Sequence, residues 1–225
     1  MILITATSTV SDGNMYNRHN REDPAVFTCL KNFVTHHDIS PDHTTRFNPL
    51  YDFVVNDFCR YVIVQPDTGG LGMSKNDGLF ADALFTTETN HALLLPVADC
   101  VAAVLYDPEH HALGVAHLGR HSLEQDGGRK IIEFMHQQFD SNPQAIEVHL
   151  GPAPSKESYP IWALDNKGMK EATFEQLASA GIVQEHIHNN AAETDKDPHY
   201  YSYSEFLKGN QTKDGDYAVV TMIKD

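Results

Sequence analysis

Three short apolar segments follow one another between residues 93 and 117, with a tight polar turn between each and the next. They cover residues 93–97, 101–106 and 113–117, and their turns lie at 98–99 and 107–111. Short apolar runs that are bounded by turn residues are typical of buried β-strands. This part of the sequence therefore predicts neighbouring strands and commits the chain to a fold built around a β-sheet.

Further elements flank these strands on both sides. The sequence predicts helices over residues 24–37, 128–139 and 169–180. It predicts additional strands over residues 61–64, 83–87, 146–150, 200–203 and 217–223. Because strands and helices do not alternate regularly, we expect an α/β or α+β fold in which helices cover a mixed sheet. The chain has no internal repeat and no long linker, so we expect a single domain over residues 1–225.

The charge balance limits the partners of the chain. It has 31 Asp and Glu residues against 16 Lys and Arg residues, which gives a formal net charge of -15. Such a chain repels nucleic acid and anionic membrane surfaces, so neither is expected as a partner. The first apolar stretch is too short for a signal sequence or a membrane span, and the three Cys residues form no CxxC pair. We therefore expect a cytoplasmic protein without a disulfide framework.

Cys100 and His117 are the residues of this segment that can carry chemistry. Cys100 directly precedes one predicted strand, and His117 ends the next strand along the chain. A thiolate and an imidazole that are delivered from neighbouring strand ends can hold zinc or copper, or can act as a nucleophile and its base. The residues alone leave both interpretations open.

Several motifs around this pair resemble those of one family. They are ADAL at 81–84 followed by Thr86, VADC at 97–100, AHLG at 116–119 and GP at 151–152. In this order and spacing they resemble the laccase-domain family, also called the multicopper polyphenol oxidase or domain-of-unknown-function 152 group. The resemblance is strongest over residues 60–155 and implies a laccase-domain-like fold. Members of the family have been assigned purine nucleoside phosphorylase and adenosine deaminase activities.

The resemblance also implies a metal site, which in the family is usually described as zinc. Its ligands come from a Gln-Val-His motif, from the Cys of the ADC motif and from the His of an AHAGWRG motif. Cys100 and His117 match the second and third ligands. At the first position this chain has Gln65, Pro66 and Asp67, so that Asp67 takes the place of the His. Since a carboxylate can ligate zinc, we expect a site of Cys100, His117 and Asp67.

Other family motifs are altered. The Gly-Trp-Arg-Gly stretch becomes Gly119, Arg120, His121 and Ser122, which moves the Arg one position earlier and puts His121 in its place. His121 is then the candidate proton shuttle, and Arg120 is a candidate substrate contact. Near the C-terminus, Tyr201 and Tyr203 are candidates to stack on a base, although the paired Arg residues of the family are missing there. These changes affect phosphate binding most.

The leading hypothesis is a zinc-dependent enzyme that acts on purine nucleosides, with phosphate as co-substrate in phosphorolysis or with water in adenosine deamination. One alternative is a catalytically silent member that binds a ligand or partner. Further alternatives are a copper-dependent polyphenol oxidase and a metal-free Cys/His enzyme of acyl transfer. The sequence leaves the oligomeric state open.

Overall fold

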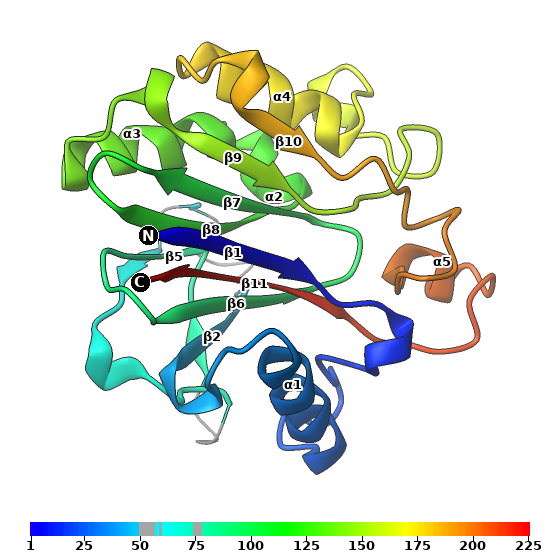
Figure 1. The fold of residues 1–225 in the computed structure, drawn as a ribbon. Helices are drawn as coiled ribbons and strands as arrows, with labels where there is room; N and C mark the ends of the chain where they lie inside the picture. The colour runs from blue at the N-terminus through cyan, green and yellow to red at the C-terminus, as the bar shows by residue number, and fades with distance from the viewer. Residues whose placement is uncertain (50–56, 59, 74–77) are drawn as a thin grey trace.

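The computed structural model describes residues 1–49, 57, 58, 60–73 and 78–225. Within these residues the chain forms two β-sheets with helices on their outer faces (Figure 1). The strands are β1 (Ile2–Thr7), β2 (Thr44–Asn48), β3 (Tyr61–Ile63), β4 (Leu79–Phe80), β5 (Ala83–Thr86), β6 (Ala92–Val97), β7 (Val101–Asp107), β8 (Ala112–Leu118), β9 (Glu147–Leu150), β10 (Ile187–Asn189) and β11 (Tyr217–Lys224). The α-helices are α1 (Pro24–His36), α2 (Arg120–Glu124), α3 (Gly127–Phe139), α4 (Met169–Ser179) and α5 (Tyr203–Leu207).

Both sheets are mixed. One has the strand order β1-β11-β6-β2-β4, in which β1, β11 and β6 are antiparallel neighbours while β2 runs parallel to β6 and β4. The other has the order β10-β9-β7-β8-β5-β3, with an antiparallel centre and a parallel pair at each edge. The two segments that the sequence most clearly predicts as adjacent strands, β7 and β8, form a hairpin at the centre of the second sheet.

Side-chain alternation along the strands explains the layers. On β7, Ala102 and Val104 point toward the first sheet, while Ala103 and Leu105 point toward α3 and α4. On β6, Leu93 and Leu95 pack between the sheets, while Leu94 packs against α1. Both strands are mostly apolar because both of their faces are buried. The result is a four-layer arrangement of helix, sheet, sheet and helices.

Local sequence signals begin α1 where it was expected. The side chain of Asp23 accepts a hydrogen bond of 3.0 Å from the Ala25 N–H, and Pro24 occupies the first helical position. The buried side of the helix, which includes Leu30 and Phe33, covers the outer face of the first sheet. The helices predicted over 128–139 and 169–180 are present as α3 and α4.

The predicted fold class is confirmed, but several details differ from the prediction. The sequence predicted one mixed sheet, whereas the structure has two. The strand predicted over 200–203 is wrong, because Ser202 there caps α5: its hydroxyl accepts a hydrogen bond from the Glu205 N–H at 3.2 Å. The sequence analysis also missed β1 and β2, whose pairing partners lie far away in the chain.

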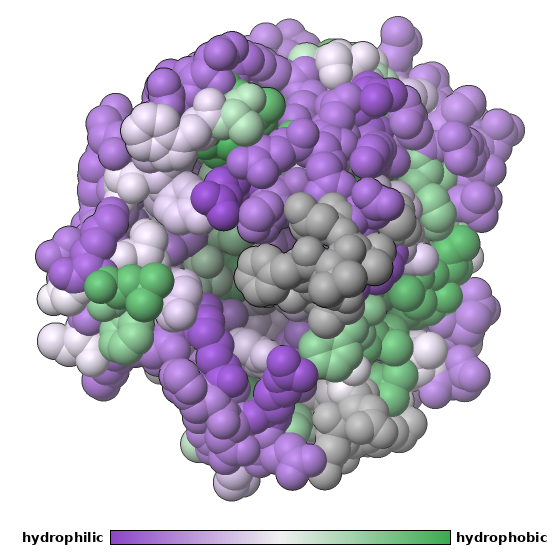
Figure 2. All heavy atoms as spheres, turned by 180° about the vertical axis from the view of Figure 1, so that it is seen from behind, coloured by the Kyte–Doolittle hydropathy of each residue, from purple (hydrophilic) through white to green (hydrophobic). Residues whose placement is uncertain are grey.

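The surface agrees with the acidic composition. The face turned away from the viewer in Figure 1 is mostly hydrophilic, with apolar patches between the polar side chains (Figure 2). None of the helices in the described part of the chain is long and apolar enough to cross a membrane.

Candidate functional site

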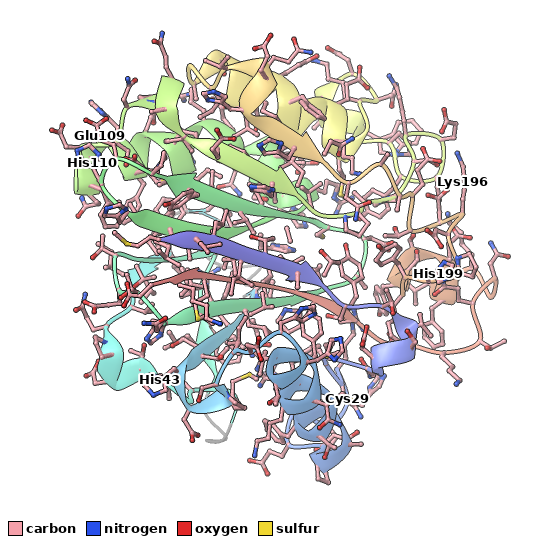
Figure 3. The ribbon with its side chains drawn as sticks, in the orientation of Figure 1. Cys29, His43, Glu109, His110, Lys196 and His199 are labelled. Atoms are coloured by element: carbon pink, nitrogen blue, oxygen red, sulfur yellow. The ribbon has the colours of Figure 1, made fainter. Side chains whose placement is uncertain are left out.

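The β7–β8 hairpin brings Cys100 and His117 to the same end of the second sheet. His117 pairs with Ala102, and Leu118 pairs with Val101. Cys100, which directly precedes Val101, therefore lies beside the residues that follow β8. The tight turn of this hairpin, which carries His110, lies at the opposite end of both strands (Figure 3).

Gly119 shows how closely the two side chains converge. A Cβ atom at Gly119 would lie 2.8 Å from the Sγ of Cys100, 2.9 Å from the Cε1 of His117 and 3.3 Å from its Nε2. The thiol and the imidazole thus face the same small space, which stays open because residue 119 has no side chain. The backbone of Gly119 has φ -91°, so glycine is needed here for space and not for a left-handed conformation.

His117 is buried, and burial lowers its pKa to about 4. Its backbone N–H donates a 2.9 Å hydrogen bond to the carbonyl of Asp82, which fixes the end of β8. A neutral imidazole keeps a lone pair that can bind a metal ion or accept a hydrogen bond. The same burial disfavours the imidazolium that a thiolate–imidazolium pair for acyl transfer requires.

The turn before Cys100 is held by Asp99. This residue has a left-handed backbone with φ 77° and a buried side chain. Its carboxylate accepts hydrogen bonds from the Thr194 hydroxyl at 2.8 Å and from the Ser204 N–H at 2.7 Å. Asp99 therefore ties the turn that carries Cys100 to the segment that begins α5.

Cys100 and His117 open into a cavity of about 640 Å³. Three other residues from the sequence analysis, Arg120, His121 and Tyr203, also line it. Arg120 and His121 are in α2, directly after Gly119, while Tyr203 begins α5. The structure thus brings together five of the seven candidate residues: Cys100, His117, Arg120, His121 and Tyr203.

Asp67 is not brought to the pair. β3 runs parallel to β5, and Tyr61 pairs with Ala83, which in turn pairs with Ala116 next to His117. The start of β3 is therefore the end near His117. Asp67 lies beyond the other end of β3, in an exposed 3₁₀ turn, and does not line the cavity. The structure therefore does not place Asp67 beside Cys100 and His117.

Tyr201 also lies outside the cavity. Its ring is buried against Gly215, where an added Cβ would lie 2.8 Å from its Cε1. The side chain is therefore a packing residue of the C-terminal segment. Tyr203, two residues later, lines the cavity instead.

Several other residues that line the cavity could not be recognised in the sequence. Arg18, Arg21 and Arg60 come from parts of the sequence that showed no motif. Tyr159 also lines the cavity, and its pKa is raised first by burial and also by Cys100, while Arg120 opposes this rise. Asp216 is a buried carboxyl group of the cavity wall. The sequence offered one signal, which is that an acidic chain has only six Arg residues. In the structure, four of these six line the cavity.

Two of the three expected zinc ligands, Cys100 and His117, come together in the structure. A thiol and a neutral imidazole that face one open space are suitable zinc or copper donors. Asp67 does not supply the third ligand. Within the part of the chain that the structure describes, no three His, Cys, Asp or Glu side chains are placed to hold a metal ion.

The other two Cys residues do not extend this site. Cys29 lies on α1 and packs against the apolar cluster between this helix and the first sheet (Figure 3). It is partly buried at the edge of this cluster, whereas its position on a predicted helix indicated a core residue. Cys59 lies outside the described residues.

The chain is similar to known proteins over this region. Residues 60–167 match the family model described as multi-copper polyphenol oxidoreductase laccase. A protein of Bacillus subtilis named purine nucleoside phosphorylase YlmD is 26% identical over 181 residues, which cover 69% of this chain and 65% of the relative. A purine nucleoside phosphorylase of Staphylococcus saprophyticus is 28% identical over 172 residues, or 66% of this chain and 64% of the relative. The matches thus span just under two thirds of these relatives' length.

Solved structures share the fold over nearly the whole chain. The hypothetical protein YfiH of Bacillus licheniformis has a TM-score of 0.81 at 17% identity, covering 99% of this chain and 93% of that protein. YlmD of Geobacillus stearothermophilus has a TM-score of 0.79 at 18% identity, covering 99% and 91%. At such low identities, the structural similarity shows a shared fold. Evidence for a common family comes instead from the ordered motifs and the matching family model. The matching family model, the named relatives and the shared fold together support assigning the chain to the laccase-domain family, from which it diverges in sequence.

Proposed function

We propose that this chain is an enzyme that acts on purine nucleosides in the cavity of Cys100 and His117. The observation that carries the proposal is the convergence of the Cys100 thiol and the neutral His117 imidazole on the space above Gly119. Relatives that match the chain at 26% and 28% identity are named purine nucleoside phosphorylases. The reaction is either phosphorolysis of the glycosidic bond or hydrolytic deamination of the base.

The cavity suits a ligand of this kind. A volume of about 640 Å³ is within the range that small-molecule sites have in proteins. The aromatic side chains of Phe80, Tyr159 and Tyr203 line it and can pack against a flat purine ring. Polar groups in the same wall can bind the ribose hydroxyls, so the site combines apolar contact with directed hydrogen bonds.

Arg120 is the proposed contact for phosphate. It lies next to Gly119, and its Nε is buried with no hydrogen-bond partner among the described residues. Its nearest carboxylate in an ion pair, that of Glu124, is 4.0 Å away. In phosphorolysis, a phosphate oxygen forms a bond to C1′ of the ribose as the bond from C1′ to the purine nitrogen breaks, and the base takes up a proton. Arg120 would orient the phosphate, and His121 is the proposed proton donor.

The zinc of the proposed enzyme would be held by Cys100 and His117. Zinc bound there would supply a Lewis acid and a bound water of lowered pKa. The burial of His117 keeps its imidazole unprotonated, and the absence of a side chain at Gly119 leaves space beside it. Copper would use the same two donors, but a polyphenol oxidase is expected to have several copper sites, and Cys100 and His117 are one pair of donors.

Product analysis tests this proposal. Purified protein is analysed for zinc and copper, and is then incubated with inosine or adenosine in the presence and absence of phosphate. Phosphorolysis releases a free base only with phosphate, whereas deamination converts adenosine to inosine without it. A zinc-loaded sample that converts neither nucleoside would refute the proposal and would favour the catalytically silent alternative.

A further inference from the structure

Arginine is concentrated in the cavity. The whole chain has six Arg residues, and four of them, Arg18, Arg21, Arg60 and Arg120, line this cavity. The chain as a whole is strongly acidic, with a net charge of -15. Arg is the side chain best suited to bind phosphate, because its planar guanidinium group offers several N–H donors to the oxygens. Four Asp residues line the same cavity, so whether it attracts an anion depends on which of the Arg residues they neutralise.

Two of these residues form one part of the cavity wall, which we call the Arg18–Arg21 rim. They are three positions apart, so their Cα atoms lie within about 11 Å of each other. The guanidinium of Arg18 lies 4.3 Å from the ring centroid of Tyr203, and that of Arg21 lies 5.1 Å from the ring centroid of Phe80. Both rings also line the cavity. Aromatic stacking therefore holds the two cations at the cavity surface.

Of the two rim residues, Arg21 is the one whose charge is more available to an anion. Asp99 is engaged by Thr194 and Ser204, and Asp82 is paired with Arg60 at 3.4 Å. Arg18 is fixed by ion pairs to Asp214 at 2.7 Å and Asp216 at 2.5 Å. No ion pair of Arg21 is found within the described residues, so this guanidinium has the larger share of unneutralised charge.

A fifth Arg residue adds positive charge beside the cavity. Arg46 of β2 is buried, and burial lowers its pKa to about 10, so it stays protonated at neutral pH. Its Nε and Nη1 have no hydrogen-bond partner among the residues that the structure describes. A Cβ added at Gly78 would lie 3.0 Å from the Nδ2 of Asn48, a cavity residue, and 3.5 Å from the Nη2 of Arg46. The charge of Arg46 therefore lies next to the cavity wall.

We infer that the Arg18–Arg21 rim binds a phosphate monoester, so that the preferred substrate is a purine nucleoside monophosphate. This inference rests on the proposed function for the base and ribose, and it assigns the phosphate ester to a rim that is separate from Arg120. Inorganic phosphate remains the co-substrate at Arg120. The two anions are thus bound by different Arg residues of one cavity.

Binding measurements test the inference without requiring turnover. The affinities of inosine and of inosine 5′-monophosphate are measured by calorimetry for the full chain, for Arg21→Gln and for Arg129→Gln. Arg21 and Arg129 are both surface Arg residues, but Arg129 is on α3, paired with Asp126 and Glu133, and outside the cavity. We expect the nucleotide to bind at least about tenfold more tightly than the nucleoside, because each charge-assisted hydrogen bond favours it.

Arg21→Gln should remove most of this advantage, and Arg129→Gln should retain it. Adding salt should weaken binding of the nucleotide more than binding of the nucleoside, since the difference in affinity is electrostatic. Equal affinity for inosine and its monophosphate, or an advantage that survives Arg21→Gln, would overturn the inference. If inosine is turned over without any preference for the nucleotide, this inference fails and the proposed function stands. If the nucleotide binds tightly but neither compound is converted, the proposed function fails and the phosphate rim stands.

Discussion

The backbone N–H of Ser204 donates a 2.7 Å hydrogen bond to the buried carboxylate of Asp99, the residue directly before Cys100. This bond joins the turn between β6 and β7 to the start of α5, although 105 residues separate its partners. Two walls of the cavity are therefore connected by one carboxylate. The position of the Cys100 thiol depends on this connection as well as on the strand pairing of β7.

Asp99→Asn should loosen this connection. Asparagine tolerates the left-handed backbone of residue 99, but its amide group cannot accept hydrogen bonds at both positions. We expect a loss of about 1–3 kcal/mol in the free energy of unfolding, because a buried N–H or hydroxyl is left without its acceptor. Denaturant unfolding measures this loss. Thr194→Val is the matched comparison, because it removes the hydroxyl that donates to Asp99 and leaves the Ser204 hydrogen bond in place. Unchanged stability in both variants would show that Asp99 does not hold the turn.

Gly119→Ala should separate Cys100 from His117. The new methyl group would lie 2.8 Å from the thiol and 2.9 Å from the imidazole, so at least one of them must move. Because displacing a reacting group by about 1 Å can cost about 100-fold in rate, we expect a loss of nucleoside conversion of that order. The control is Gly151→Ala, where the nearest atoms would lie at 3.5 Å, an ordinary contact distance. Equal activity of the two variants would argue against the convergence of the pair as the basis of catalysis.

Asp216 should make the protein less stable as the pH rises. Burial raises its pKa from 3.8 to about 7, although Arg18 opposes the rise. Between these two values the folded protein keeps a proton that the unfolded chain releases, so the contribution of this group to stability is full below pH 3.8 and is lost by about pH 7. The unfolding free energy of the wild type, measured relative to Asp216→Asn, should therefore fall across this range. A difference that stays constant or rises with pH would contradict this protonation behaviour.

Metal binding should depend on Cys100 and not on Asp67. Cys100 faces the space above Gly119, while Asp67 is exposed beyond the far end of β3. Elemental analysis of purified protein should therefore show that Cys100→Ala loses zinc and that Asp67→Ala keeps the wild-type content. Treatment of the wild type with a chelator should lower nucleoside conversion, and added zinc should restore it. Loss of zinc in Asp67→Ala would contradict this expectation and would support the set of three ligands predicted from the sequence.

Much of the fold could be predicted because its signals are local. The hairpin of β7 and β8 is apolar on both faces, α1 begins with an Asp-Pro cap, and each of these features can be recognised within about 20 residues. The convergence of Cys100 and His117 follows from the same hairpin. The division into two sheets was missed, since it depends on pairs such as β1 with β11, whose residues are joined only in three dimensions.

The rest of the site could not be predicted for the same physical reason. Arg18, Arg21 and Arg60 reach the cavity from loops and strand ends that are far apart in the chain, and a single Arg in the sequence reads as a surface residue. Asp67 illustrates the opposite error. A motif position was assigned from spacing, whereas the register of β3 against β5 decides which end of the strand meets His117.

The central claim is that the Cys100–His117 cavity converts purine nucleosides, and one assay tests it most directly. Folded wild-type protein and folded Cys100→Ala, matched by circular dichroism, are incubated with inosine and adenosine, each with and without phosphate, and the products are separated by chromatography. The account predicts conversion of at least one nucleoside by the wild type and a loss of at least about 100-fold in Cys100→Ala, as expected when a group at the reacting centre is removed. Equal conversion by both proteins, or none by a zinc-loaded wild type, would contradict it.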